Sequence, residues 1–194
     1  MKQQILTILF FGFIGSLSAQ VEGNRSYSKD VALYRAKEFL MSNVLDTNDR
    51  SIEFEVIPLV AEGSGELTTL IFNCEEQNKR GLIIGFFNDK WLNPTGVNVE
   101  SYSFKVFNEE QATEFIDLIN KEVDKSWKFL KKNWKTNNLI VRYQDVDVLI
   151  WTSSSAPLMR VFWNGYDAEW GSSSFNRSKR RFERKIEKYN ETAN

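Results

Sequence analysis

One long segment with helical periodicity divides the strand-like segments of this chain into two groups. Between Asn108 and Trp134, apolar residues recur at the three- and four-residue spacing of a single helix face. Asn108 and Gln111 form the capping-box pattern that begins a helix, and three lysines near the end suit its negative pole. Because strand-like segments both precede and follow this helix, the chain is predicted to have an α+β fold.

Four strand-like segments precede the long helix. Residues 51–59 and 99–107 alternate apolar and polar side chains, as half-buried strands do. Residues 66–74 form a further strand, and the continuously apolar residues 81–88 suit a central strand covered on both faces. A loop is predicted at residues 89–98. Short connections favour antiparallel neighbours, so the four strands are predicted to form a meander.

A second β region follows the helix. Residues 139–151 are predicted to form one or two strands, and Asn164-Gly165 lies between two alternating runs, which is the strongest short signal of a hairpin. A two-residue turn there places Trp163 opposite Tyr166 and Arg160 opposite Glu169. One face of this hairpin then carries Met159, Val161, Trp163, Tyr166, Ala168 and Trp170, and the other carries Arg160, Phe162, Asp167 and Glu169.

Two shorter helices are also predicted. One precedes the first group of strands, from Ser28 to about Val44, and the other follows the hairpin, over residues 175–189. The complete expectation is an antiparallel sheet of about five to seven strands. The long amphipathic helix packs across one face of that sheet, with its tryptophans, Trp127 and Trp134, in the core. The N- and C-terminal helices pack at an edge or on the other face.

The first nineteen residues have the pattern of a secretory signal peptide. Lys2 precedes the charge-free apolar run Ile5–Ile14, and small residues follow at positions 15–19. The run is shorter than the roughly 20 residues that a transmembrane helix needs, although its length also suits a buried core helix. The prediction is a cleaved leader at 1–19 and a single globular domain at 20–194. The mature protein is then secreted or periplasmic, without a membrane span.

Two residue counts exclude several chemistries. The chain has no histidine and one cysteine, Cys74. A Ser-His-Asp or Cys-His nucleophile pair, a His-ligated zinc and an internal disulfide framework are therefore excluded, and neither a metal nor a cofactor is predicted. Cys74 ends an apolar strand and is predicted to be a small buried residue. The formal net charge of −1 gives no general attraction to nucleic acid.

The hairpin region supplies the first candidate site. Sugar rings pack against aromatic side chains, while their hydroxyl groups bind to carboxylates and guanidinium groups. The candidate ligand-binding residues are Trp151, Arg160, Trp163, Tyr166, Asp167, Glu169 and Trp170. The simpler alternative is that the aromatic face belongs to the hydrophobic core and that Arg160 and Glu169 form an ordinary cross-strand ion pair.

Two further candidates are charged. Asp145 and Asp147 project to one side if they lie in a strand, where they suit Ca²⁺, but they also suit a polar turn between two strands. Residues 177–188 hold seven Lys or Arg and two Glu, so Arg180, Arg181 and Arg184 form a candidate surface for a partner or an anionic lipid headgroup. Alternatively, this helix packs on its own domain with a solvated outer face.

The predicted function is that of an exported noncatalytic module that binds a partner protein or an envelope component such as a glycan. The alternative is a carboxylate-dependent hydrolase that acts on glycans. Its acids would come from Asp145, Asp147, Asp167 and Glu169. Such an enzyme needs two carboxyl groups about 5–5.5 Å apart, or roughly 6.5–9.5 Å apart, across an open cleft.

Overall fold

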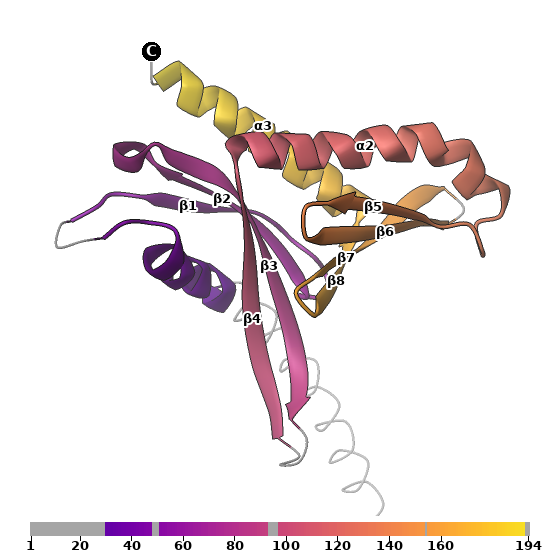
Figure 1. Cartoon of the computed structure of the whole chain (residues 1–194), viewed down its shortest axis with the longest axis horizontal. Coiled ribbons are helices and arrows are strands. Elements are labelled where there is room, and N and C mark those ends of the chain that lie inside the picture. Colours follow the sequence, from indigo (N-terminus) through magenta and orange to yellow (C-terminus); the bar gives the residue numbers. More distant parts are fainter. Residues whose placement is uncertain (1–29, 48–50, 93–96, 154, 193–194) are drawn as a thin grey trace, which may run out of the picture.

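A computed structural model describes residues 30–47, 51–92, 97–153 and 155–192 of the chain. Eight strands form two four-stranded antiparallel sheets, and helices pack around them (Figure 1). The predicted α+β class is confirmed, whereas the prediction of one sheet with five to seven strands is wrong. The predicted leader and the predicted helix start at Ser28 lie outside the described residues.

Sheet A is the predicted meander. Its strands are β1 (Glu55–Ala61), β2 (Leu67–Cys74), β3 (Lys79–Leu92) and β4 (Val97–Asn108), in that spatial order, with the short helix η1 (Glu75–Gln77) between β2 and β3. The predicted loop at 89–98 is wrong for most of its length. The β3–β4 ladder continues through Asp89–Glu100 to Leu92–Val97, so the two strands form one long hairpin.

Sheet B follows the long helix. Its strands, in spatial order, are β5 (Leu139–Tyr143), β6 (Val146–Ser153), β7 (Ala156–Trp163) and β8 (Tyr166–Gly171). The predicted hairpin register is confirmed, with Trp163 opposite Tyr166 and Arg160 opposite Glu169. Asn164 and Gly165 both have positive φ angles, of 48° and 76°, as the type I′ turn requires.

The N-terminal helix, described over residues 30–43, covers one face of sheet A. Its Ala36 and Leu40 are fully buried against side chains that alternate along the strands, such as Phe72 of β2 and Ile83 of β3. Cys74 belongs to the same cluster and is fully buried and unpaired, so its prediction as a small buried residue is confirmed.

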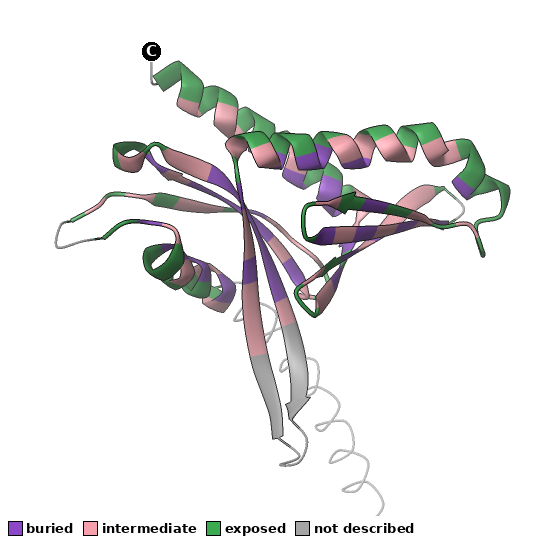
Figure 2. Cartoon of the chain, in the orientation of Figure 1, coloured by how far each residue is buried: buried purple, intermediate pink, exposed green. Residues whose placement is uncertain are grey.

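The opposite face of sheet A belongs to a larger core, which also includes one face of sheet B. Helices α2 (Glu109–Lys132) and α3 (Ser172–Thr192) contribute to this core (Figure 2). Trp170 of β8 lies within it, with ring centroids 6.4 Å from Phe115 of α2 and 4.9 Å from Phe175 of α3. Phe115 in turn stacks on Phe107 of β4 at 4.9 Å. Aromatic contacts therefore join both sheets to both helices.

Helix α2 begins as predicted but ends early. The Asn108 side chain accepts the N–H of Gln111, and the Gln111 side chain accepts the N–H of Asn108, which completes the capping box. The helix ends at Lys132, so its periodicity does not extend to Trp134. The prediction that Trp134 lies in the core is wrong, because its side chain is 50% exposed, whereas Trp127 packs against the core.

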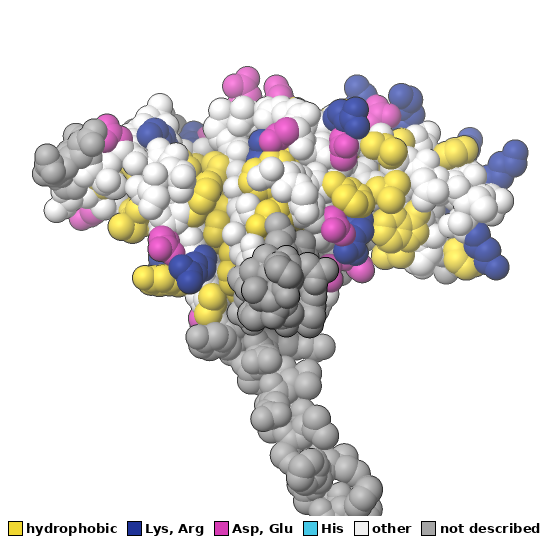
Figure 3. Space-filling view, turned by 60° about the horizontal axis from the view of Figure 1, so that its bottom comes forward, with side chains coloured by type: hydrophobic (Ala, Val, Ile, Leu, Met, Phe, Trp, Pro, Cys, Tyr) yellow, Lys and Arg dark blue, Asp and Glu magenta, His cyan; other side chains and the backbone are white. Residues whose placement is uncertain are grey.

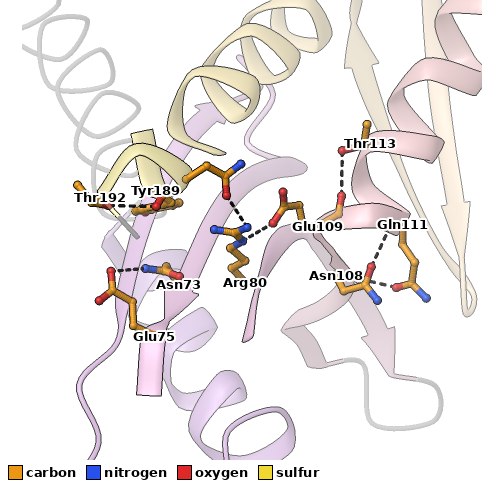
Figure 4. A network of polar contacts seen from close by, with 10 residues as sticks. Asn73, Glu75, Arg80, Asn108, Glu109, Gln111, Thr113, Tyr189 and Thr192 are labelled. Carbon is orange, nitrogen blue, oxygen red and sulfur yellow. Dashed lines mark hydrogen bonds and ion pairs between the residues drawn. The ribbon is translucent and has the colours of Figure 1, made fainter. Parts of the chain in front are cut away.

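Polar contacts fasten α3 to sheet A. Thr69 of β2 and Ser178 of α3 share a buried hydroxyl–hydroxyl hydrogen bond of 2.8 Å. At the other end of the helix, Arg80 of β3 forms an ion pair with Glu109 of α2 and donates a 2.6 Å hydrogen bond to Asn190 of α3 (Figure 4). The two long helices are therefore held at the same end of β3.

Side chains, rather than strand pairing, join the two sheets at β8. The register turns the N–H groups of Glu169 and Gly171 away from β7, toward the outer edge of the sheet. Glu62, which follows β1, accepts the Gly171 N–H at 2.8 Å, and Glu66, which precedes β2, accepts the Glu169 N–H at 3.4 Å. These carboxylates occupy the edge at which sheet A would have to pair, and so the sheets stay separate.

Candidate functional site

Sheet B has one covered face and one open face. Alternate residues of its strands, including Val148, Met159, Val161 and Trp170, are buried in the larger core under α2 and α3. The residues between them project to the opposite side, where no described helix packs (Figure 1). We call this side the outer face. It comprises Ile140, Arg142, Asp147, Leu149, Trp151, Leu158, Arg160, Phe162, Asp167 and Glu169.

The strand register orders these side chains in rows across the sheet. One row runs Arg142, Asp147, Phe162, Asp167, and the next runs Ile140, Leu149, Arg160, Glu169. A third row places Trp151 opposite Leu158. Opposite residues lie within contact distance, so the first two rows bring apolar and charged groups together, while the third is apolar.

The apolar residues of the outer face are accessible to solvent. Ile140 is 65% exposed and Phe162 is 38% exposed, while Leu149, Trp151 and Leu158 are half-buried. Hydrophobic side chains gather over sheet B in Figure 3, with groups of both charges beside them. Contiguous apolar surface of this kind is typical of sites that contact another molecule.

The charged residues of the outer face are largely paired with one another. Arg142 donates two hydrogen bonds to Asp147, of 2.6 and 2.9 Å, and these bonds hold the pKa of the Asp147 carboxyl below its ordinary value. Arg160 forms an ion pair with Asp167 and lies 3.9 Å from a carboxylate oxygen of Glu66. Arg160 is thus drawn toward Asp167 and Glu66, although its partner in the register is Glu169.

Four of the seven predicted ligand-binding residues come together on the outer face. Trp151, Arg160, Asp167 and Glu169 all project there. The other three do not join them. Trp163 and Tyr166 pack near Phe86 of β3, with ring centroids 5.8 and 6.4 Å from it, and Trp170 is fully buried. Their core interpretation is confirmed.

Asp145 lies in the turn between β5 and β6 and holds sheet B against sheet A. It forms an ion pair with Lys105 of β4 and accepts a 2.7 Å hydrogen bond from the indole N–H of Trp163. The hydrogen bond from Lys105, supported by that from Trp163, lowers the pKa of the Asp145 carboxyl. The polar-turn interpretation of Asp145 is therefore correct, and Asp147 lies in β6 instead.

This contact should make stability depend on pH. A carboxyl group whose pKa is lowered by folding stabilises the fold above its unfolded pKa, and the contribution is lost as the pH falls through the folded value. We expect Asp145→Asn to destabilise the protein at pH 7, with a difference from wild type that shrinks between about pH 5 and pH 2. Urea unfolding at a series of pH values measures this difference. The exposed Asp124 of α2 supplies the control, Asp124→Asn, and an Asp145→Asn effect that is independent of pH would contradict the prediction.

The four acids proposed for a hydrolase line none of the pockets described among the placed residues. Asp145 and Asp147 are ion-paired and have lowered pKa values, whereas a general acid needs a raised one. Asp147 and Asp167 lie two strands apart, about 10 Å at the usual strand spacing.

The predicted partner surface on α3 is divided by the structure. Arg180 and Arg184 are exposed, and Arg184 donates a 3.3 Å hydrogen bond to the carbonyl of Arg180. Arg181 instead donates to the carbonyl of Leu59 in β1. It also lines a pocket of about 410 Å³ between β1, α3 and the N-terminal helix. Arg181 therefore has a structural contact that its neighbours lack.

The residues missed at the sequence level fall into two groups. Ile140 and Leu149 follow the alternation of their strands, so that pattern could have assigned them to the face on which the hairpin register already placed Phe162. Glu62 and Glu66 carry no such signal, because their contacts with β8 span 109 and 103 residues of sequence.

The last observations concern metal sites, membrane-spanning helices and similarity to known proteins. Within the placed residues, no cluster of three or more His, Cys, Asp or Glu side chains is arranged to hold a metal ion. None of the helices described is both long enough and apolar enough to cross a membrane. Comparisons with protein-family models, curated proteins and solved structures found no match to this chain.

Proposed function

We propose that this protein is an exported, noncatalytic module that binds a partner protein through the outer face of sheet B. One observation carries the proposal: within the described chain, one face of a four-stranded sheet is left uncovered, and it exposes apolar side chains such as Ile140 and Phe162. The leader-like pattern of residues 1–19 supports export.

The charges around this face indicate the kind of partner. Asp147 and Asp167 are each neutralised by an arginine, so Glu169 gives the face an excess of negative charge, to which Glu66 adds at the neighbouring edge of β8. A second copy of the chain that docked by the same face would bring the same excess with it. The complementary partner is a different protein that presents apolar side chains bordered by lysine or arginine.

A glycan hydrolase is less well supported. Its acids would have to include a carboxyl group with a raised pKa, while the shifts of Asp145 and Asp147 are in the opposite direction. The ion pairs of the outer face suit a protein interface, in which paired charges surround an apolar centre.

The test compares three forms of the protein as baits in extracts of the cell envelope. They are wild type, an outer-face variant with Phe162→Ser and Glu169→Lys, and a control with Arg180→Glu and Arg184→Glu on α3. We expect wild type and the control to retain the same protein and the outer-face variant to lose it. The retained protein is then purified and titrated with each bait, and we expect the outer-face variant to weaken binding at least about tenfold.

Three results would contradict the proposal. The first is an unchanged affinity of the outer-face variant. The second is loss of binding by the α3 control alone, which would assign the site to α3. The third is a concentration-dependent dimer of wild type that the outer-face variant abolishes, because the occupant would then be a second copy. Thermal unfolding of each bait verifies that it is folded.

A further inference from the structure

The end of α2 and the turn after it form a basic and aromatic projection. Residues 125–144 contain five lysines and Arg142 but no aspartate or glutamate, although the whole chain has a formal net charge of −1. We call the exposed part of this segment the α2 tip. It comprises Lys125, Lys128, Phe129, Lys131, Lys132, Trp134 and Lys135.

Two aromatic rings of the α2 tip face solvent. Phe129 is 54% exposed and Trp134 is 50% exposed, while their neighbour Leu130 is fully buried in the larger core. All five lysines of the tip are exposed as well. The tip therefore carries apolar rings that the described fold leaves uncovered, one on the last turns of α2 and one in the turn after it.

Lysines border both exposed rings. Phe129 has Lys125 one helical turn before it and Lys132 three residues after it. The Trp134 ring lies 5.3 Å from the ammonium group of Lys135. Each ring is thus flanked by lysines, whose long flexible side chains allow the ammonium groups and the ring to contact the same surface.

The position of the tip limits what it can bind. Figure 1 shows the end of α2 at the edge of the molecule, beyond sheet B. Phe129 and Trp134 line none of the four pockets described among the placed residues, so the rings stand on a projection. Single-stranded nucleic acids stack on aromatic residues within grooves. Rings that project among lysines instead suit insertion into the headgroup region of an anionic bilayer.

We propose that the α2 tip docks the protein onto the surface of a bilayer that contains anionic phospholipids. Phe129 and Trp134 enter the boundary between headgroups and acyl chains, and the surrounding lysines contact the lipid phosphates. The basic face of α3 has arginines but no exposed large apolar side chain, so it lacks the second half of this arrangement. The proposal is independent of the partner assigned to the outer face.

The test is cosedimentation with large unilamellar vesicles. One set contains phosphatidylcholine alone and the other contains 30% phosphatidylglycerol. A charge variant, Lys128→Gln with Lys132→Gln, is compared with a ring variant, Phe129→Ser with Trp134→Ser. The control is Lys37→Gln with Lys188→Gln, which removes two exposed lysines from other helices. All forms carry the same N-terminus, so that residues 5–14 contribute equally.

We expect wild type and the control to bind the anionic vesicles and not the neutral ones. Each lysine at an anionic surface raises partitioning about fivefold, so the charge variant should lose about 25-fold. The ring variant should lose at least about tenfold with its salt dependence retained. Because the replaced side chains are exposed, the midpoint of thermal unfolding should not change in any variant.

The proposal is overturned by any of three results. These are no binding to anionic vesicles, equal binding to neutral vesicles, or an equal loss in the control. A parallel titration with a single-stranded oligonucleotide tests whether the α2 tip binds nucleic acid instead of a lipid surface. Tight binding of the oligonucleotide through the same residues, without vesicle binding, would assign the α2 tip to nucleic acid instead.

Discussion

Replacing Trp170 with alanine should lower the free energy of unfolding by about 3–5 kcal/mol. Trp170 is fully buried between Phe115 of α2 and Phe175 of α3. Its removal leaves a cavity where β8 meets both helices. The neighbouring side chains on α2 and α3 are held in the core and cannot collapse into this cavity. Because single domains are stable by only about 5–15 kcal/mol, this is a large fraction of the total. Urea unfolding followed by far-UV circular dichroism measures the loss.

The same substitution at Trp134 is the matched control. Trp134 is 50% exposed and lies beyond the end of α2, so Trp134→Ala should change the unfolding free energy by less than about 0.5 kcal/mol. Equal losses at the two positions would contradict the assignment of Trp170 to the centre of the core.

The second large effect is expected at Gly81, at the start of the β3–β4 ladder opposite Asn108. A Cβ atom at this position would overlap the carbonyl oxygen of Phe107 and lie 2.9 Å from the Cα of Asn108. Both are backbone atoms, which cannot rotate away as a side chain does. We therefore expect Gly81→Ala to cost about 3 kcal/mol or more, at the upper end of overpacking effects.

Gly63 provides the comparison for this prediction. A Cβ atom at Gly63 would have no atom within 4 Å, so Gly63→Ala should be neutral or stabilise the fold by up to about 1 kcal/mol. Thermal and urea unfolding of both variants give the two values. A Gly81→Ala variant as stable as wild type would mean that β3 and β4 are farther apart here than described.

The parts of the fold that sequence reasoning predicted correctly depend on short-range signals. Asn164-Gly165 specified both the turn and the register of β7 with β8, because a two-residue hairpin leaves no other pairing. Asn108 and Gln111 marked the start of α2 because both partners of the capping box lie within four residues. Alternation identified β1 and β4, and a continuous apolar run identified β3. The position of Cys74 at the end of an apolar strand indicated that it is buried.

The division into two sheets depends on long-range contacts that no local pattern reports. Alternation shows which side of a strand is buried, but it does not show which strand lies beside it. The separation depends on Glu62 and Glu66, which are polar residues in a loop and resemble any others in the sequence. The end of α2 was also misjudged, because Trp134 continues the periodicity of a helix that has already ended at Lys132.

The candidate site shows the same limit. Trp151, Arg160, Asp167 and Glu169 were grouped by composition, and the structure brings them to one face. Trp163 and Trp170 were grouped with them as aromatic residues, although the hairpin register already placed both on the face opposite Arg160 and Glu169. The orientation of Trp151 depends instead on the pairing of β6 with β7, where Trp151 lies opposite Leu158. No turn signal as strong as Asn-Gly precedes that pairing, so the face to which Trp151 projects became clear only from the register.

The side chains at the edges of the two sheets also bear on how the protein behaves at high concentration. An edge strand with free backbone groups can recruit a strand from another molecule and so begin a fibrous aggregate. In β1, Pro58 has no N–H to offer and the Leu59 carbonyl already accepts from Arg181. In β8, the outward N–H groups of Glu169 and Gly171 are taken up by Glu66 and Glu62. Of the four edge strands, β1 and β8 are therefore poor templates for intermolecular pairing, while the outer face of sheet B remains open.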